Sequence, residues 1–200
     1  MEPFDTVPKR DPDGALAPHA RGWDWNKRKH YDQAIEAFDA AIRLDALCAA
    51  AFNGRGFAYN GKKRYDRAMR DLDEAIRLDP SLAQAFNNRG YAWNGLKHHD
   101  RAIEALNEAI RLDPGFADAF NGRGFAYMGL KRYARAIEDL SEAIRLDPGF
   151  ASAFNNRGRA WIGAKQYDRA IADLDEAIRL DPDFTAACVN REMAARLTGS

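Results

Sequence analysis

Apolar residues recur along most of the chain in two kinds of segment, both with helical spacing. Phe120, Gly124 and Tyr127 fall at i, i+4 and i+7, which places them on one face of a helix. A second apolar segment around Leu140 has the same periodicity and ends before Pro148, which cannot continue a helix. No segment alternates with the period of a strand. The basic unit is therefore predicted to be a pair of amphipathic helices joined by a short turn.

This helix pair recurs with a fixed period of 34 residues, as the series Phe52, Phe86, Phe120 and Phe154 shows. Neither helix can bury its apolar face alone, so neighbouring pairs must stack into an array. The predicted organisation is a flexible leader or worn repeat at 1–14, five repeats at 15–48, 49–82, 83–116, 117–150 and 151–184, and a capping helix with a tail at 185–200. Positions within a repeat are numbered from 1 to 34 below.

The two ends of the array depart from the pattern. In the first repeat Pro18 is expected to begin the first helix, where proline is tolerated. Ala46 replaces the usual proline, so the second helix of that repeat is expected to run on towards Cys48. The last segment has a polar side and an apolar side, the latter made of Ala186, Ala187, Val189, Met193, Ala194 and Leu197. A half-repeat with a solvated outer face would close the last open edge of the array.

Seven positions of the repeat carry a characteristic residue type. In the third repeat these are Phe86 at position 4, Gly90 at 8, Trp93 at 11, Ala102 at 20, Leu106 at 24, Ala109 at 27 and Pro114 at 32. Over residues 15–197 this pattern resembles the tetratricopeptide repeat family. The resemblance implies an all-α fold, a right-handed α-solenoid or superhelix of antiparallel helix pairs. It also implies a concave groove, lined by the first helix of each pair, that holds an extended peptide or a partner helix.

Position 7 differs from the family, which usually has Leu there. This chain has Arg at Arg55, Arg89, Arg123 and Arg157. A buried Arg without a partner is costly, so carboxylates should lie near. The candidates are Asp71, Asp139 and Asp173 at position 23, and we predict pairing within a repeat or across the next interface. The alternative is that each Arg lays its stem over the core and keeps its charge in water.

A further stripe on the first helices, at positions 2, 5, 9 and 12, is not needed for the core. At position 5 it holds a row of Asn, whose amides can bond to a peptide backbone; at position 9 it holds aromatic rings and then Arg159. At position 6, where family members can hold peptide backbones with Asn, Gly and Asn alternate. Because only Arg159 is basic along the stripe, a carboxylate clamp is not expected. The candidate groove residues are Asn53, Phe57, Gln84, Asn87, Asn88, Tyr91, Asn94, Asn121, Phe125, Asn155, Asn156 and Arg159. The alternative interpretation is that the rings fold onto neighbouring helices and the Asn residues cap or solubilise.

Charge and composition exclude several classes of partner. Lys plus Arg and Asp plus Glu both number 30, so the formal net charge is zero and neither nucleic acid nor an anionic membrane is expected as a partner. The two cysteines, Cys48 and Cys188, are too few for a disulfide framework or a zinc site. No apolar run is long enough to span a membrane, and the N-terminus lacks the apolar core of a signal peptide. A cytoplasmic location is the expectation.

No group of residues stands apart from the repeat as a catalytic constellation. The Asn-Gly-Arg-Gly of the second and fourth repeats resembles a phosphate loop, but no strand precedes it and its glycine sits inside a predicted helix. His98, His99 and Asp100 lie at a helix–helix turn, where His99 replaces the Tyr of other repeats. We therefore expect no enzyme activity, no catalytic residues, no cofactor and no metal.

The sequence thus predicts a protein–protein interaction scaffold that binds a protein or peptide in its groove. We expect it to be a monomer, or to self-associate weakly through the ends of the array. Two alternatives remain: a targeting or adaptor module of a larger enzyme or assembly, and, with less support, a nucleic-acid adaptor.

Overall fold

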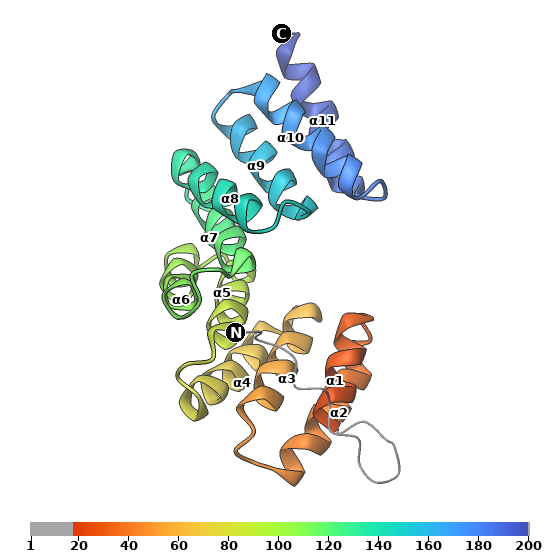
Figure 1. Cartoon of the computed structure of the whole chain (residues 1–200), viewed down its shortest axis with the longest axis vertical. Coiled ribbons are helices and arrows are strands. Elements are labelled where there is room, and N and C mark those ends of the chain that lie inside the picture. Colours follow the sequence, from red (N-terminus) through yellow and green to blue (C-terminus); the bar gives the residue numbers. More distant parts are fainter. Residues whose placement is uncertain (1–17, 200) are drawn as a thin grey trace. The chain divides into compact units, whose positions relative to one another are not determined.

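The computed structural model describes residues 18–199, and this part of the chain is helical without a strand (Figure 1). The helices are α1 (Pro18–Lys27), α2 (Tyr31–Leu44), α3 (Ala49–Gly61), α4 (Tyr65–Leu78), α5 (Ala83–Gly95), α6 (His99–Leu112), α7 (Ala117–Gly129), α8 (Tyr133–Leu146), α9 (Ala151–Gly163), α10 (Tyr167–Leu180) and α11 (Thr185–Thr198). The all-α prediction is confirmed. The leader predicted at 1–14 lies outside the described residues, as do positions 15–17.

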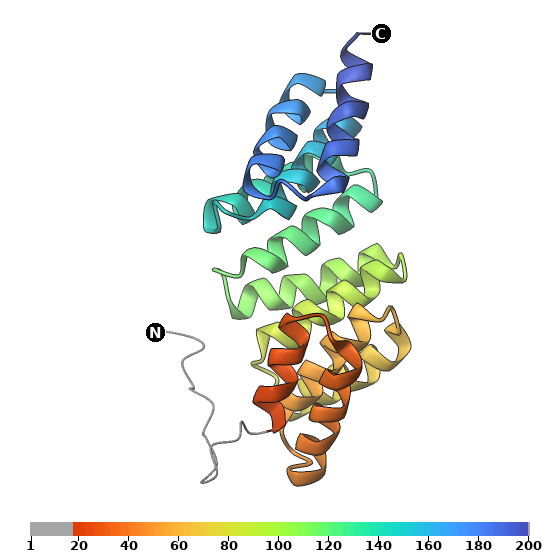
Figure 2. The ribbon, with the colours of Figure 1, turned by 90° about the vertical axis from the view of Figure 1, so that its right-hand side faces the viewer.

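The described residues form two compact units, 18–95 and 96–199. In the N-terminal unit α1 packs on α2 and α3 on α4, while α1, α3 and α5 follow one another side by side. In the C-terminal unit α7 packs on α8 and α9 on α10, and α7, α9 and α11 form the corresponding row (Figure 2). Each unit is thus an α-solenoid of antiparallel helix pairs, as predicted.

In the first, second, fourth and fifth repeats, the core of the helix pair is built from a large residue at position 24 that meets a glycine at position 8. Phe38, Leu72, Leu106, Leu140 and Leu174 are the largest fully buried side chains. A Cβ atom added to Gly56, Gly124 or Gly158 would lie 2.7, 2.7 and 2.6 Å from the Cγ atom of Leu72, Leu140 and Leu174, respectively. No side chain fits there. These glycines therefore allow the two helices of a pair to approach closely.

The turn inside each pair uses a left-handed residue that the sequence did not reveal. Lys29, Lys63, Lys97, Lys131 and Lys165, all at position 15, have φ between 56° and 63°. In the second repeat the N–H of Lys63 donates to the carbonyl of Asn60 and that of Arg64 to Tyr59, both at 2.9 Å. A left-handed residue that closes a helix with such bonds is a common C-terminal cap.

The predicted extension of the second helix in the first repeat is wrong, because α2 ends at Leu44. Asp45 is extended there (φ −142°, ψ 99°), as Asp79 is after α4 (φ −136°, ψ 93°). The Asp45 carboxylate accepts from the N–H of Leu47 at 2.9 Å, and Asp79 accepts from Ser81 at the same distance. The aspartate turn ends these helices, so the missing proline changes little.

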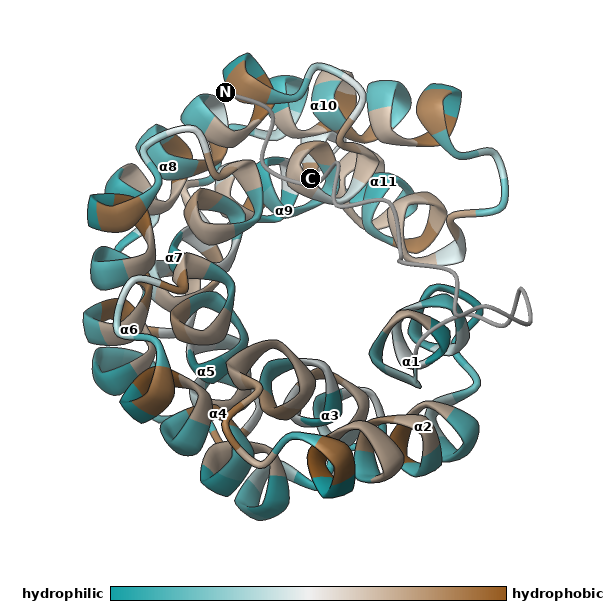
Figure 3. Cartoon of the chain, turned by 60° about the horizontal axis from the view of Figure 1, so that its bottom comes forward, coloured by the Kyte–Doolittle hydropathy of each residue, from teal (hydrophilic) through white to brown (hydrophobic). Residues whose placement is uncertain are grey.

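The outer faces of α4, α6, α8 and α10 carry repeated ion pairs. The equivalent pairs Glu74–Arg77, Glu108–Arg111, Glu142–Arg145 and Glu176–Arg179 all join at 2.6 Å. Hydrophilic and hydrophobic stretches alternate along α8 and α10, which is the pattern of amphipathic helices (Figure 3). Among the described helices, none combines the length and the apolar character that crossing a bilayer requires.

Candidate functional site

The position-7 arginines hold helices together, as predicted. Arg55 binds Asp71 through two parallel hydrogen bonds of 2.8 and 2.6 Å. The same bidentate geometry joins Arg123 to Asp139 at 2.8 and 2.7 Å, and Arg157 to Asp173 at 2.7 Å for both bonds. Hydrogen bonding to Asp71 raises the pKa of Arg55 despite its partial burial. In three repeats the predicted pairing is therefore confirmed, and it lies within the repeat.

A third bond from each of these arginines reaches position 25 of the preceding repeat. Arg55 donates to Asp39 at 2.5 Å, Arg123 to Asn107 at 2.7 Å and Arg157 to Ser141 at 3.0 Å. In the third repeat position 23 is alanine, and Arg89 pairs instead with Asp73 at position 25, at 3.1 Å. The arginines thus tie consecutive repeats together and are not available as groove cations.

The Asn row at position 5 is buried, which contradicts the expected open ladder of amides. Asn53, Asn87, Asn121 and Asn155 are only 3 to 6 % exposed. The side-chain oxygens of three of them accept hydrogen bonds from an Asn at position 6 of the next first helix: Asn53 from Asn88 at 2.8 Å, Asn121 from Asn156 at 2.9 Å and Asn155 from Asn190 at 2.8 Å. Position 5 of one helix faces position 6 of the next. These hydrogen bonds join each first helix to the next.

Position 12 also joins neighbouring first helices, by a different chemistry in each unit. In the N-terminal unit Asn26 donates to the carbonyl of Gly54 at 2.9 Å, and Asn60 to that of Asn88 at 2.7 Å. In the C-terminal unit the same position holds Met128 and Ile162, which pack in the apolar clusters. Sequence reasoning missed this role of the amides, although Asn at one position of consecutive repeats was a visible signal.

At position 9 the first helices carry side chains that reach the surface. Phe57 and Tyr91 are 37 % and 36 % exposed. Trp23 is half-buried, edge-on to Phe38 at 5.6 Å between ring centroids, and its ring lies 6.0 Å from that of Phe57. Gln84 is half-buried, whereas Asn94 is buried. At position 9, the surface of the N-terminal unit therefore consists of uncharged aromatic rings.

The C-terminal unit differs at this position because a cation caps the ring. Phe125 is half-buried, and the guanidinium of Arg159 lies 5.6 Å from its centroid. Arg159 itself is exposed, and its Nη1 contacts the amide oxygen of the half-buried Asn156 at 3.4 Å. Stacking and this contact hold the charge above the ring.

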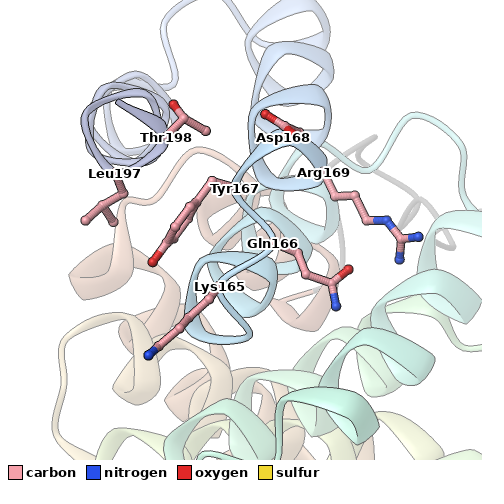
Figure 4. A pocket seen from close by; sticks show the side chains of 7 residues that line it. All are labelled: Lys165, Gln166, Tyr167, Asp168, Arg169, Leu197 and Thr198. Atoms are coloured by element: carbon pink, nitrogen blue, oxygen red, sulfur yellow. The ribbon is translucent and has the colours of Figure 1, made fainter. Parts of the chain in front are cut away.

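A pocket lies between the start of α10 and the end of α11 (Figure 4). It is lined by Lys165, Gln166, Tyr167, Asp168, Arg169, Leu197 and Thr198. In earlier repeats the position-17 ring sits on a glycine at position 13 of the next helix: a Cβ on Gly163 would lie 2.3 Å from Tyr133, and one on Gly129 would lie 2.3 Å from His99. His99 thus replaces Tyr in packing, as predicted. On α11 position 13 is Leu197, which leaves a gap beside Tyr167.

In the pocket, the Thr198 hydroxyl donates to the backbone carbonyl of Ala195 at 2.7 Å. Within residues 18–199 there is no group of three His, Cys, Asp or Glu side chains that could hold a metal ion. What both units share is a row of first helices with rings on one side.

Comparison of the sequence with known protein families identifies the repeat that forms this row. A model of the tetratricopeptide repeat matches residues 25–83, 63–117, 93–149 and 121–183. The chain belongs to the tetratricopeptide repeat family. Proteins of this fold commonly bind proteins or peptides and are generally non-enzymatic scaffolds. A comparison with curated protein sequences found no match.

Several solved tetratricopeptide repeat structures are similar in fold. The thermophilic repeat protein TTC0263 of Thermus thermophilus superimposes with a TM-score of 0.79 at 17 % identity, over 89 % of this chain and 97 % of that one. YrrB, described as having an unusual peptide-binding site, gives 0.63 at 23 % identity, over 96 % and 98 %. The first such domain of Spaghetti (RPAP3), bound to the HSP90 peptide SRMEEVD, gives 0.58 at 23 % identity, over 61 % and 97 %.

Proposed function

We propose that this tetratricopeptide repeat protein is an interaction scaffold whose first helices bind a segment of a partner protein. The observation that carries the proposal is the exposure of Phe57 and Tyr91 at equivalent positions of successive first helices. Large rings beside polar groups are typical of binding surfaces, because they bury much area on contact. The peptide-binding relatives YrrB and RPAP3 support the same function by fold.

Binding in the N-terminal unit would come mainly from apolar side chains of the partner. The Asn53 and Asn87 amides are buried, so they position the helices and do not reach a ligand backbone. Phe57, Tyr91 and Gln84 remain as contact residues. Because these groups carry no charge, the affinity should depend weakly on salt. A nucleic-acid ligand would instead give affinity that falls steeply with salt.

The C-terminal unit would contribute a polar contact through Arg159, with Phe125 and Asn156 behind it. An exposed guanidinium stacked on a ring is preorganised to meet an acceptor on the partner. The proposed contact residues therefore differ in kind between the two units: rings in one, and a ring with a cation in the other.

The experiment is selection of a random peptide library against the full chain, followed by calorimetric titration of a selected peptide. The F57A/Y91A double variant should lose about tenfold or more in affinity, because exposed rings are the anchors. The matched control is E142A/R145A on the outer face of α8, which should bind as the wild type does. Equal affinity of wild type and F57A/Y91A, or equal loss in the control, would refute the proposed groove.

A further inference from the structure

The turn that joins the two helices of each pair holds a lysine in an unfavourable backbone conformation. Position 15 is exposed in every repeat and has φ between 56° and 63° at Lys29, Lys63, Lys97, Lys131 and Lys165. Glycine adopts this left-handed conformation without the steric cost that a side chain brings. The backbone is therefore better served by glycine, and what lysine adds at this position is an exposed ammonium group.

Consecutive turns of this kind lie beside one another in the C-terminal unit. A Cβ on Gly129, at the end of α7, would lie 2.3 Å from the ring of His99, which follows the preceding turn. A Cβ on Gly163 would lie at the same distance from the ring of Tyr133. Position 13 of one repeat thus packs on position 17 of the repeat before it. This contact places the position-15 lysines of three successive repeats in a row along one edge of the unit.

The row is most basic at the turn between α7 and α8. Lys131, Arg132 and Arg135 are all exposed there, and none of them forms an ion pair with a carboxylate of residues 18–199. The other four repeats have Asp at position 18, whereas the fourth has Ala134. The first turn of α8 accordingly holds no acidic residue. Three positive charges are thus left without a counter-charge in their own turn.

An ion pair between repeats neutralises part of the corresponding edge in the N-terminal unit. Lys62, at position 14, pairs with Asp32 at position 18 of the preceding repeat. In the third, fourth and fifth repeats position 14 is uncharged, so this pairing has no equivalent in the C-terminal unit. The fifth repeat has Asp168 at position 18, but Figure 4 shows its carboxylate and the Lys165 side chain pointing away from each other.

We propose that a basic edge of the C-terminal unit, formed by Lys97, Lys131, Arg132, Arg135 and Lys165, binds an acidic segment of a partner protein. Clustered cations that lack counter-charges favour a ligand of opposite charge. Because the cations follow successive turns, the segment that fits them is extended and rich in Asp and Glu. The basic edge lies on the turns and not on the groove side of the first helices, so it adds a second contact to the proposed groove.

The side chains around the basic edge favour a peptide over nucleic acid. Single-stranded nucleic acids bind where their bases stack on free rings. The rings of His99 and Tyr133 pack on the following helix, and the guanidinium of Arg169 covers the ring of Trp161 at 4.9 Å from its centroid. The formal net charge of the chain is also zero, so no long-range field attracts a long polyanion. A short acidic peptide needs only the local cluster of cations.

The first experiment measures the fluorescence anisotropy of a labelled acidic peptide titrated with the full chain. A peptide of about twelve alternating Asp and Glu residues spans about 40 Å when extended. It should bind the wild type, and its affinity should fall about tenfold or more between about 0.05 and 0.3 M salt, because salt screens contacts between exposed charges. Failure of the wild type to bind at low salt, or affinity that does not change with salt, would overturn the proposal.

Glycine substitution separates the charge of the lysines from their role in the turn. K131G/K165G should bind the acidic peptide about fivefold or more weakly. Its helicity by circular dichroism should be unchanged, because glycine tolerates the left-handed backbone. The matched control R111Q/R145Q removes the same charge from the outer helix faces, where both arginines are 66 % exposed, and should bind as the wild type does. An equal loss of affinity in the control would overturn the assignment to the basic edge.

Ala134→Asp tests the missing counter-charge. The variant has the residue that the other repeats already carry at position 18, so α8 should form normally. Affinity for the acidic peptide should fall about threefold or more, because a carboxylate then lies among the cations. Unchanged affinity would contradict the proposed role of this turn. Oligothymidylate, or vesicles that contain phosphatidylserine, should bind the wild type more weakly than the peptide does; tighter binding of either would overturn the choice of partner.

The basic edge and the groove can be tested independently. F57A/Y91A should bind the acidic peptide as the wild type does, and K131G/K165G should bind the library-selected peptide as the wild type does. Loss of both peptides in both variants would overturn the proposal of two separate surfaces. Loss of only one peptide in each variant supports it, and either surface can fail without the other.

Discussion

The two units build the same helix pairs but join their first helices differently. In the N-terminal unit, Asn26 and Asn60 donate to backbone carbonyls of the following first helix. In the C-terminal unit, Met128 and Ile162 pack apolar surface at the same position. Position 12 can therefore be filled by a hydrogen bond or by apolar contact. In both units, position 12 thus joins neighbouring first helices.

The position-7 arginines are the contrasting case, because they form their third bond in both units. Arg55 and Arg123 both bind an Asp of their own repeat and a polar group of the preceding one. This pattern joins three helices at one side chain. The units thus share what fixes the stacking and differ in what lines the groove.

The largest expected effect on stability comes from breaking the arginine–aspartate pairs that both units share. Asp139→Ala should lower the free energy of unfolding by about 3 kcal/mol, because it leaves the half-buried Arg123 without its bidentate partner. Replacing both residues by Leu should be close to neutral, since the unpaired charge is then absent. Urea unfolding measures both. A control is Asp175→Ala, whose pair with Arg191 is about half exposed and should contribute little. Equal effects of D139A and D175A would contradict the proposed contribution of the Arg123–Asp139 pair to stability.

The next largest effect on stability is expected from the packing of Phe38 against Gly54, which is found only in the N-terminal unit. Phe38 stands where the other repeats have Leu, and a Cβ on Gly54 would lie 2.2 Å from its ring. Gly54→Ala should therefore cost about 1–3 kcal/mol by overpacking. In a Phe38→Leu background the smaller side chain should relieve much of that cost. The double-mutant cycle by urea unfolding measures the coupling; strict additivity would show that the ring does not set the requirement for glycine.

A smaller effect on stability is expected from exchanging the residue types at position 12 between the two units. Asn60→Met and Met128→Asn should each change the free energy of unfolding by no more than about 1 kcal/mol. Asn60 loses one hydrogen bond, but its buried Oδ1 has no partner to lose. Thermal and urea unfolding of both variants measure this. A large loss in either would mean that the bridge at position 12 is specific to its unit.

The smallest effect comes from the outer ion pairs common to both units. Hydrogen bonding from Arg145 lowers the pKa of Glu142, and Arg77 does the same to Glu74. A lowered carboxyl pKa adds stability above the unfolded value of about 4.3, and this is lost as pH falls through the folded value. Glu142→Gln should therefore reduce the acid-dependent loss in urea midpoint slightly, and less so in high salt. An unchanged acid profile would show that these pairs contribute nothing.

Much of the fold follows from the sequence because it depends on contacts within one repeat. The helices, the close approach at Gly124 and the pairing of Arg123 with Asp139 all involve residues whose spacing is fixed by the 34-residue period. The end of α2 was missed because Asp45, and not the absent proline, forms the stop. The turn formed by Asp45 ends the helix even though the helix-breaking proline is absent.

The groove was harder to predict because it depends on how one first helix faces the next. The burial of Asn53 beneath Asn88 follows from the rotation between repeats, which periodicity alone does not specify. Exposure of the rings at position 9 matches the expectation for Phe57 and Tyr91, while Phe125 lies beneath Arg159. Which of these residues touch a partner stays a prediction.

The most direct test of the scaffold account is amide chemical-shift mapping of the full chain with a peptide selected from the random library. The account predicts that shifts concentrate on the first helices, above all around Phe57 and Tyr91, and disappear in the F57A/Y91A variant. Shifts confined to the outer faces of α4, α6, α8 and α10, or unchanged in that variant, would contradict it.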